Sequence, residues 1–211
     1  MSWRIHPQGQ PFALGGALTA TLLAALGFKR AAGGAALASL AAAYFFRDPD
    51  RRPPWPRAAV VAPADGKVVL VRQEPEPLWV GGDAWRIAIF MSLTDVHINR
   101  APLDARVVRI RHQPGQYLPA HRDDALARNE RRFYCLERDD GARVLLVQVA
   151  GLLARRTVPL VSSGEFVARG QRLGLIRFGS RVEVFLPTAA QPLVAQGHRV
   201  RAGETPIAWW E

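Results

Sequence analysis

The sequence predicts a mainly β protein of the α+β class, an antiparallel β body with few helices, preceded by an apolar helical hairpin. Two patterns lead to this prediction. From about residue 58 onward, short stretches rich in β-branched residues alternate with turn residues, as in an antiparallel sheet. Before that point, two long apolar runs lie next to each other. A chain of 211 residues is long enough for one domain with an appendage.

The two apolar runs predict a membrane-associating helical hairpin over residues 1–47. They cover residues 12–28 and 31–46, and Lys29 and Arg30 separate them. As a helix, each run would reach roughly 25 Å at 1.5 Å per residue, which is shorter than the roughly 30 Å hydrocarbon core of a bilayer. This favours a shallow or re-entrant anchor. Two thin membrane spans and a cleaved signal peptide are the alternatives.

Residues 48–57 are rich in proline and arginine and predict a linker, because this composition cannot form regular helix. The predicted β domain covers residues 58–211. Its strands are expected at 60–61, 68–72, 86–91, 106–111, 143–150, 157–161, 171–177 and 181–186. One charged, solvent-facing helix is expected at residues 123–131.

The charge of the chain predicts an anionic partner. The formal net charge is +10, and Lys29 and Lys67 are the only lysines, so nearly all the positive charge is arginine, whose planar fork suits phosphate. Nucleic acid is the usual partner of such a charge. However, no nucleic-acid-binding module is recognisable and the arginines are spread along the chain, which favours an anionic lipid surface. Cys135 is the only cysteine, which excludes a disulfide framework and a thiol metal site.

The only Gly-Ser dipeptide, Gly179-Ser180, stands before an alternating, strand-like run. Because glycine has no Cβ, a neighbouring hydroxyl can approach its carbonyl closely. Ser180 Oγ could attack the Gly179 carbonyl, shift the acyl group from nitrogen to oxygen, and eliminate. The products would be a β chain, residues 1–179, and an α chain, residues 180–211, that starts with a pyruvoyl group able to form a Schiff base. The alternative is an ordinary turn before a strand.

Several further motifs accompany this dipeptide in a fixed order. Residues 61–68, 90–102 and 174–182, together with 45–49, 127–131 and 151–156, resemble the phosphatidylserine decarboxylase family in its short bacterial and archaeal form. The resemblance implies a zymogen that cleaves itself and a pyruvoyl-dependent lyase of phospholipid biosynthesis. Such an enzyme converts phosphatidyl-L-serine to phosphatidylethanolamine and CO2 through a Schiff base to the pyruvoyl group.

The resemblance also assigns the site residues. Ser180 becomes the pyruvoyl group, and Gly179 supplies the carbonyl that is attacked. His97 is the acid or base in cleavage, decarboxylation or both, and Asp65 is its orienting partner. We expect residues 95–97 to alternate as in a strand, with Asp95 and His97 on one face.

One position departs from the family. Arg100 stands where the longer bacterial enzymes carry a second histidine, which completes their self-cleavage triad. Either His97 also serves cleavage or the short class uses another base. Arg100 is therefore a candidate for stabilising the oxyanion or for holding the substrate phosphate or carboxylate. His112, in an expected loop, is a reserve candidate for substrate binding.

The implied cofactor is the pyruvoyl group formed from Ser180, without metal or pyridoxal phosphate. The implied partners are a phospholipid substrate and a membrane surface, with no nucleic acid. The location is the cytoplasmic face of the cell membrane. The two cleavage chains should stay associated, because the α chain contributes a strand to the core and is too short to fold alone. Whether they form a higher homo-oligomer is left open.

A second resemblance gives the runner-up function. Residues 161–176 resemble the hairpin of lipoyl- and biotinyl-type domains, and residues 63–68 resemble the opening strand of the same hybrid barrel. This predicts a membrane-tethered carrier or binding module that uses Lys67. That hypothesis leaves His97 and Ser180 unexplained, so we take the pattern as evidence for a barrel-like, hybrid-barrel β body whose closing strand carries the cleavage bond.

Overall fold

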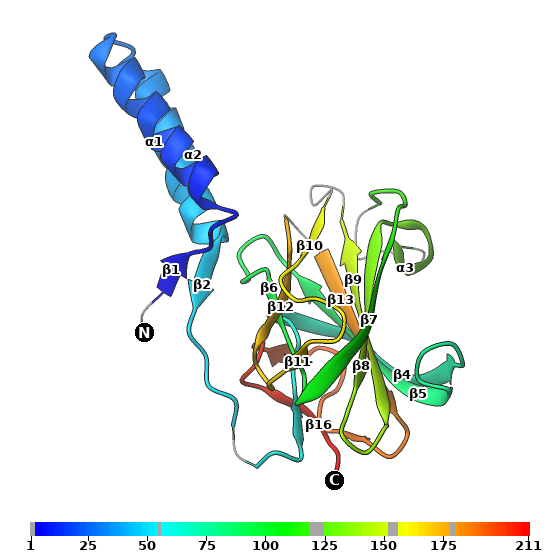
Figure 1. Cartoon of the computed structure of the whole chain (residues 1–211). Coiled ribbons are helices and arrows are strands. Elements are labelled where there is room, and N and C mark those ends of the chain that lie inside the picture. The colour runs from blue at the N-terminus through cyan, green and yellow to red at the C-terminus, as the bar shows by residue number, and fades with distance from the viewer. Residues whose placement is uncertain (1–2, 55, 119–124, 152–155, 178–179) are drawn as a thin grey trace. The chain divides into compact units, whose positions relative to one another are not determined.

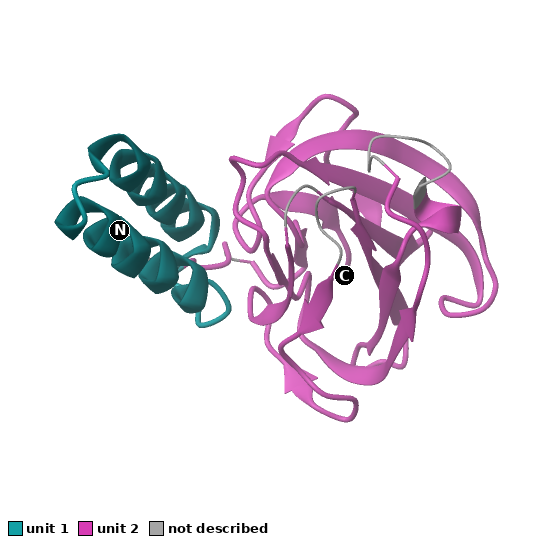
Figure 2. Ribbon diagram, turned by 90° about the horizontal axis from the view of Figure 1, so that it is seen from above, with its two compact units in different colours: residues 1–50 teal, residues 51–211 magenta. Residues whose placement is uncertain are grey.

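The computed structural model describes residues 3–54, 56–118, 125–151, 156–177 and 180–211. The chain forms two compact units, residues 1–50 and residues 51–211 (Figure 2). The first unit contains the two long helices, and the second is built mainly from antiparallel strands (Figure 1). The predicted class, a mainly β body preceded by a helical hairpin, is confirmed.

The first unit is a helical hairpin closed by a short ribbon. Its elements are β1 (Trp3–Ile5), α1 (Gln10–Ala25), α2 (Lys29–Phe45) and β2 (Arg47–Pro49), and β1 pairs with β2. Gly27 has a φ of 84° in the turn between the helices, a conformation that glycine adopts without strain. Lys29 and Arg30 were expected between the helices, but they begin the second one.

Small residues let the two helices of this unit approach each other closely. Ser39 Oγ donates a hydrogen bond to the Ala13 carbonyl over 2.6 Å. A Cβ added at Gly16 would lie 2.9 Å from the Cβ of Ser39. Large apolar side chains on both helices are exposed instead of buried between them. Neither helix, nor any other in the described part of the chain, is long and apolar enough to cross a bilayer.

The second unit is organised around one eight-stranded sheet with the strand order β11-β7-β8-β9-β13-β5-β4-β15. Two three-stranded sheets, β10-β12-β6 and β14-β16-β3, complete it, and every strand pair in these three sheets is antiparallel (Figure 1). The bounds are β3 (Ala59–Val61), β4 (Gly66–Glu76), β5 (Gly82–Met91), β6 (Ile98–Arg100), β7 (Ala105–Gln113), α3 (Ala125–Arg128), β8 (Arg131–Glu137), β9 (Arg143–Ala150), β10 (Thr157–Pro159), β11 (Phe166–Val167), β12 (Arg172–Ile176), β13 (Ser180–Pro187), β14 (Gln191–Pro192), β15 (Arg199–Val200) and β16 (Pro206–Trp209).

Each of the eight expected strands coincides with an observed one, but the expected helix ends earlier than predicted. Among the described residues of 123–131, Ala125–Arg128 are helical, and Arg131 already begins β8. The Asn129 side chain explains the early end, because it hydrogen-bonds both backbone groups of Leu118 and the carbonyl of Ala150. These contacts bind the segment to the sheet and leave no room for a further helical turn.

Strand β13 occupies a central position and is buried on both faces. Val182, Val184 and Leu186 point into the main hydrophobic core. On the other face, Glu183 is fully buried and paired with Arg86, whose Nε lies 2.5 Å from a carboxylate oxygen. Arg181 Nε lies 2.7 Å from the other oxygen of the same carboxylate. Between its neighbours β5 and β9, β13 is therefore held by backbone ladders, apolar packing and buried charge pairs.

The expected linker, residues 48–57, is divided between the two units. Asp48 and Pro49 belong to β2, whereas residues 51–54, 56 and 57 belong to the second unit. Arg169 donates hydrogen bonds to the carbonyls of Pro54, Pro56 and Ala59, over 2.6 to 2.8 Å. The proline-rich segment is therefore held to the β body through its backbone carbonyls, which suits a sequence that lacks many N–H donors.

Candidate active site

Ser180 begins the central strand and is completely buried. It pairs with Met91 of β5 on one side and with Ala150 of β9 on the other. Its hydroxyl donates a hydrogen bond to Met91 Sδ over 3.3 Å. Gly179, the other half of the predicted cleavage site, lies outside the described residues. The predicted nucleophile is thus placed where strand pairing fixes its backbone on both sides.

The strand residue opposite Ser180 is itself held from outside the sheet. The Ala150 carbonyl accepts a hydrogen bond from Asn129 Nδ2 over 2.8 Å, and the Ala150 N–H donates to the Glu130 carbonyl over 2.9 Å. The Glu130 carboxylate accepts hydrogen bonds from the Tyr117 hydroxyl and from the backbone N–H of Thr157. Residues 127–131, quoted above only as a family motif, therefore support the backbone next to Ser180.

His97 is buried, but it does not lie in a strand as expected. Residues 92–97 form a turn before β6, because the Asp95 carboxylate accepts hydrogen bonds from the backbone N–H and the hydroxyl of Ser92. The expected alternation of Asp95 and His97 is therefore wrong. His97 Nδ1 lies 2.9 Å from the Asp95 carbonyl oxygen instead. Since a carbonyl only accepts, Nδ1 carries the hydrogen, and in the neutral ring the lone pair is on Nε2.

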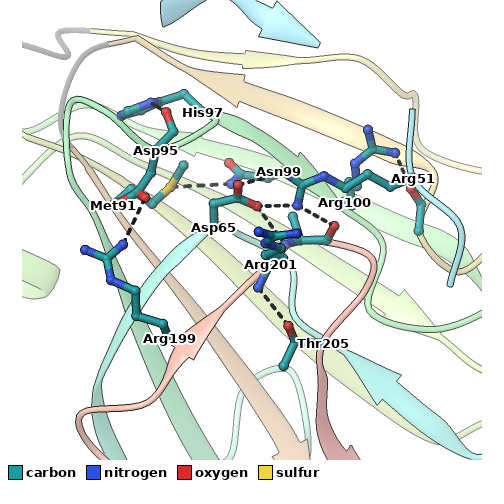
Figure 3. Close-up of polar contacts among 12 residues, drawn as sticks. Arg51, Asp65, Met91, Asp95, His97, Asn99, Arg100, Arg199, Arg201 and Thr205 are labelled. Carbon is teal, nitrogen blue, oxygen red and sulfur yellow. Dashed lines mark hydrogen bonds and ion pairs between the residues drawn. The ribbon is translucent and has the colours of Figure 1, made fainter. Parts of the chain in front are cut away.

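Asp65 lies in the turn before β4 and is nearly buried. Its two carboxylate oxygens accept hydrogen bonds from Arg51, over 2.5 and 2.7 Å, and one also accepts from the Ala202 N–H over 2.8 Å (Figure 3). The next residue, Gly66, has a φ of 147°, and a Cβ there would lie 2.1 Å from the Phe90 carbonyl oxygen. The carboxylate is therefore fixed by a bidentate arginine and by a turn that requires glycine.

The two candidate substrate contacts occupy different surroundings. Arg100, in β6, is buried and donates from Nη1 to the Gly170 carbonyl over 2.8 Å. His112 was expected in a loop but lies in β7, with Nε2 3.4 Å from a Glu130 carboxylate oxygen. Its side chain is 41% exposed. His112 thus lies beside Glu130, the residue whose carbonyl binds Ala150. Arg100 lies in the same region as Asp65 and His97 (Figure 3).

The structure brings Asp65, Met91, His97, Asn99 and Arg100 into one neighbourhood (Figure 3). In this neighbourhood the Ser180 hydroxyl donates to Met91 and the His97 ring donates to the Asp95 carbonyl. The Asp65 carboxylate accepts from Arg51. Within the described ranges, no three His, Cys, Asp or Glu residues come close enough to hold a metal ion.

The sequence did not predict a buried polar network that is connected to Ser180 through Met91. Tyr134, Gln148 and Asn99 are fully buried and hydrogen-bonded to one another, and Asn99 contacts Met91. Gln148 offered a signal, because it interrupts the apolar run from Val144 to Ala150 with a polar side chain. Met91 offered none, since methionine in a strand is ordinary core material.

Lys67, the residue of the runner-up hypothesis, lies near the start of β4, where it pairs with Phe90 of β5 and Arg199 of β15. A carrier lysine must be presented at the tip of a hairpin so that its side chain can reach other sites. A lysine that pairs with a strand on either side is not presented in this way, so the arrangement does not favour a carrier.

Comparison with known proteins shows the family of the chain. The model of the family described as phosphatidylserine decarboxylase matches residues 39–208. A phosphatidylserine decarboxylase proenzyme of Symbiobacterium thermophilum is 48% identical over 96% of this chain and 94% of its own length. Proenzymes of the same name from Erythrobacter litoralis and Pelobacter propionicus are 44% and 49% identical, over 98% and 82% of this chain and 88% and 78% of their own lengths. The chain therefore belongs to the phosphatidylserine decarboxylase family.

Proposed function

We propose that this chain cleaves itself between Gly179 and Ser180, and that the resulting pyruvoyl enzyme converts phosphatidylserine to phosphatidylethanolamine and CO2. The observation that carries the proposal is the position of Ser180. Its hydroxyl is buried at the first residue of the central strand, and its hydrogen-bond acceptor is a thioether rather than a charged group. Family membership supports the substrate class.

The proposed cleavage needs no external oxidant. Ser180 Oγ bonds to the Gly179 carbonyl carbon, and the peptide C–N bond breaks to leave an ester and a free amine. Loss of the Ser180 α-proton then breaks the ester, and residue 179 leaves as a carboxylate. The dehydrated residue takes up one water and loses ammonia, so that the α chain starts with a keto acyl group.

The surroundings of Ser180 suit such a group. A ketone at the head of β13 would be flanked by strands β5 and β9, at a position that is buried in the folded chain. When present, the group supplies an electrophile for the substrate amine and an electron sink for decarboxylation. The rest of the chemistry is binding, orientation and proton transfer, which fall to this chain's own residues.

His97 is the proposed proton carrier. Because the Asp95 carbonyl fixes the hydrogen on Nδ1, the basic nitrogen of the neutral ring is Nε2. We assign it proton transfer to the α-carbon of the substrate after CO2 leaves, and proton removal during cleavage. Asp65 is the proposed orienting group of the site, acting together with Arg51. Arg100 and His112 are the proposed contacts for the anionic parts of the substrate.

The helical hairpin is the proposed membrane attachment, at the cytoplasmic face of the cell membrane. Large apolar side chains are exposed on both helices and in the turn between them, at Phe12, Leu14, Leu18, Leu22, Leu26, Phe28, Leu37, Leu40 and Tyr44. Water-exposed helices of a soluble domain normally present one apolar face. The close contact between Gly16 and Ser39 is of the small-residue type that allows helices to pack in lipid. A peripheral or re-entrant attachment suits the 16 and 17 residues of the two helices.

Replacement of the nucleophile tests the proposal. Ser180→Ala removes the attacking oxygen, so this variant should stay a single chain and form no phosphatidylethanolamine from detergent-solubilised phosphatidylserine. The control is Ser162→Ala, which changes an exposed serine in a turn. It should cleave and decarboxylate like the unchanged protein. Denaturing mass spectrometry and lipid analysis give the two readouts, and normal cleavage of Ser180→Ala would refute the assignment.

A further inference from the structure

The Ser180 hydroxyl has an unusual acceptor for a group of this proposed role. It is completely buried, and of the residues that the structure describes, the one that accepts its hydrogen bond is Met91, through Sδ at 3.3 Å. A thioether is a weak acceptor and is not basic at any pH in the physiological range. It can therefore hold a hydroxyl in one rotamer without taking up its proton, and it releases the hydroxyl at little cost.

The sulfur atom is itself held by a chain of three buried polar side chains. The Tyr134 hydroxyl donates to Gln148 Oε1 over 3.0 Å, Gln148 Nε2 donates to Asn99 Oδ1 over 2.7 Å, and Asn99 Nδ2 contacts Met91 Sδ at 3.6 Å. In this series of hydrogen bonds, each side chain donates to the next one in the direction of the sulfur. Each amide of Gln148 and Asn99 accepts through its oxygen and donates through its nitrogen, which fixes the orientation of both. Hydrogen bonds aligned in one direction also polarise one another.

Strand β12 leaves the side chains of Tyr134 and Gln148 no room to rearrange. A Cβ added at Gly174 would lie 2.6 Å from the Tyr134 hydroxyl oxygen and 2.8 Å from Gln148 Nε2. Residues of five strands thus build the surroundings of this sulfur atom: Met91 of β5, Asn99 of β6, Tyr134 of β8, Gln148 of β9 and Gly174 of β12. The Met91 sulfur thus has polar contacts with Ser180 and Asn99, which an apolar core residue does not need.

We propose that Met91 is a positioning residue for self-cleavage, and that its sulfur holds the Ser180 hydroxyl in place through a weak hydrogen bond. The inference rests on the proposed self-cleavage at Ser180. A carboxylate or carbonyl in this place would bind the hydroxyl more strongly and delay its attack. A side chain without an acceptor would leave a buried hydroxyl unsatisfied and free to turn to other rotamers.

The sequence allows this idea to be tested by changing one atom. The chain contains two methionines, Met1 and Met91, so replacement of methionine throughout changes one residue of the β body. We would synthesise the full chain in a cell-free system supplied with methionine, selenomethionine or norleucine. Selenomethionine keeps the shape and a chalcogen acceptor, whereas norleucine keeps the shape and replaces the sulfur with CH2. Cleavage is followed by denaturing electrophoresis and mass spectrometry after translation is stopped.

Norleucine should slow cleavage about three- to tenfold, which corresponds to the loss of one modest hydrogen bond. Selenomethionine should leave the rate within about twofold, because selenium accepts a hydrogen bond as weakly as sulfur does. Equal rates with all three amino acids would overturn the proposal. A similar slowing with selenomethionine and norleucine would also overturn it, because the acceptor would then not be the property that matters.

Two controls separate positioning from packing. In Met91→Leu, only Met1 responds to the amino acid supplied, so the three preparations should cleave at one rate. Ser180→Ala lacks the hydroxyl, so its thermal unfolding midpoint with methionine and with norleucine reports packing alone. A loss of stability there, large enough to unfold the protein at the assay temperature, would assign the slowing to misfolding and refute a positioning role. If the unchanged chain itself does not cleave, the proposed function fails first, and the inference fails with it.

Discussion

At the scale of single residues, the polar side chains of the site are held mainly by backbone groups and buried partners. The His97 ring is held by the Asp95 carbonyl, and the residue opposite Ser180 by Asn129 and Glu130. A family motif can identify Ser180, His97 and Asp65 because their chemistry is local to the side chain. The motif of residues 90–102 contains Met91 and Asn99 but assigns them no role, since the three-dimensional arrangement of the strands decides what lies next to the Ser180 hydroxyl.

The role of His97 leads to a prediction about proton transfer. His97→Ala should reduce phosphatidylethanolamine formation by about 10²–10⁴-fold, the range expected on removing a general acid. The rate should be measured on material that has already been cleaved, so that maturation and turnover are separated. Asp95→Ala is a suitable comparison, because it keeps the carbonyl that contacts the ring and removes only the carboxylate that caps the turn. A His97→Ala protein with normal turnover after cleavage would show that another group protonates the substrate.

At the scale of elements, short stretches rich in β-branched residues, separated by turn residues, were sufficient to predict the central strands. Strands β5, β9 and β13 each contain a run of β-branched or other apolar residues, and all three were predicted. Strand β8 was missed because its start, Arg131-Arg132, continues a charged segment that favours helix. The Asn129 side chain decides that boundary through contacts with residues 11 and 21 positions away, which no local pattern contains.

The turn before β4 gives a prediction about stability. Arg51 and Asp65 are both nearly buried and form two hydrogen bonds, so removing one partner leaves a buried charge unpaired. Arg51→Met should lower the free energy of unfolding by about 3–5 kcal/mol. The double variant Arg51→Met with Asp65→Leu should recover much of that loss, because no unpaired charge remains. Denaturant titration of uncleaved Ser180→Ala protein measures both, and equal destabilisation of the single and double variants would contradict this interpretation.

At the scale of the whole molecule, the proposal assigns membrane attachment to the first unit and catalysis to the second. The apolar runs predicted the hairpin because their composition and length, and the two charged residues between them, can be read from the sequence. The contacts that hold Pro54 and Pro56 to the β body were not predictable, since they depend on Arg169, which lies far away in the sequence.

The exposed leucines of α1 give a prediction about membrane binding. Replacement of Leu14, Leu18 and Leu22 by serine should weaken binding to phospholipid vesicles at least tenfold, because roughly 1.5–3 kcal/mol of transfer free energy is lost for each leucine that inserts. Turnover of detergent-solubilised substrate should change little. Leu78→Ser with Leu193→Ser is the control, because these leucines are also more than half exposed but belong to the β body. If both sets of substitutions weaken vesicle flotation equally, the hairpin is not the attachment site.

The mass of the purified, unchanged protein under denaturing conditions tests the central claim most directly. Self-cleavage predicts two chains, residues 1–179 and residues 180–211, and a smaller chain that lacks a free α-amine and reacts with a carbonyl reagent. Under native conditions the two should elute together, because β13 is paired on both sides and buried on both faces. A single chain with the mass of all 211 residues, from a folded preparation, would contradict the account.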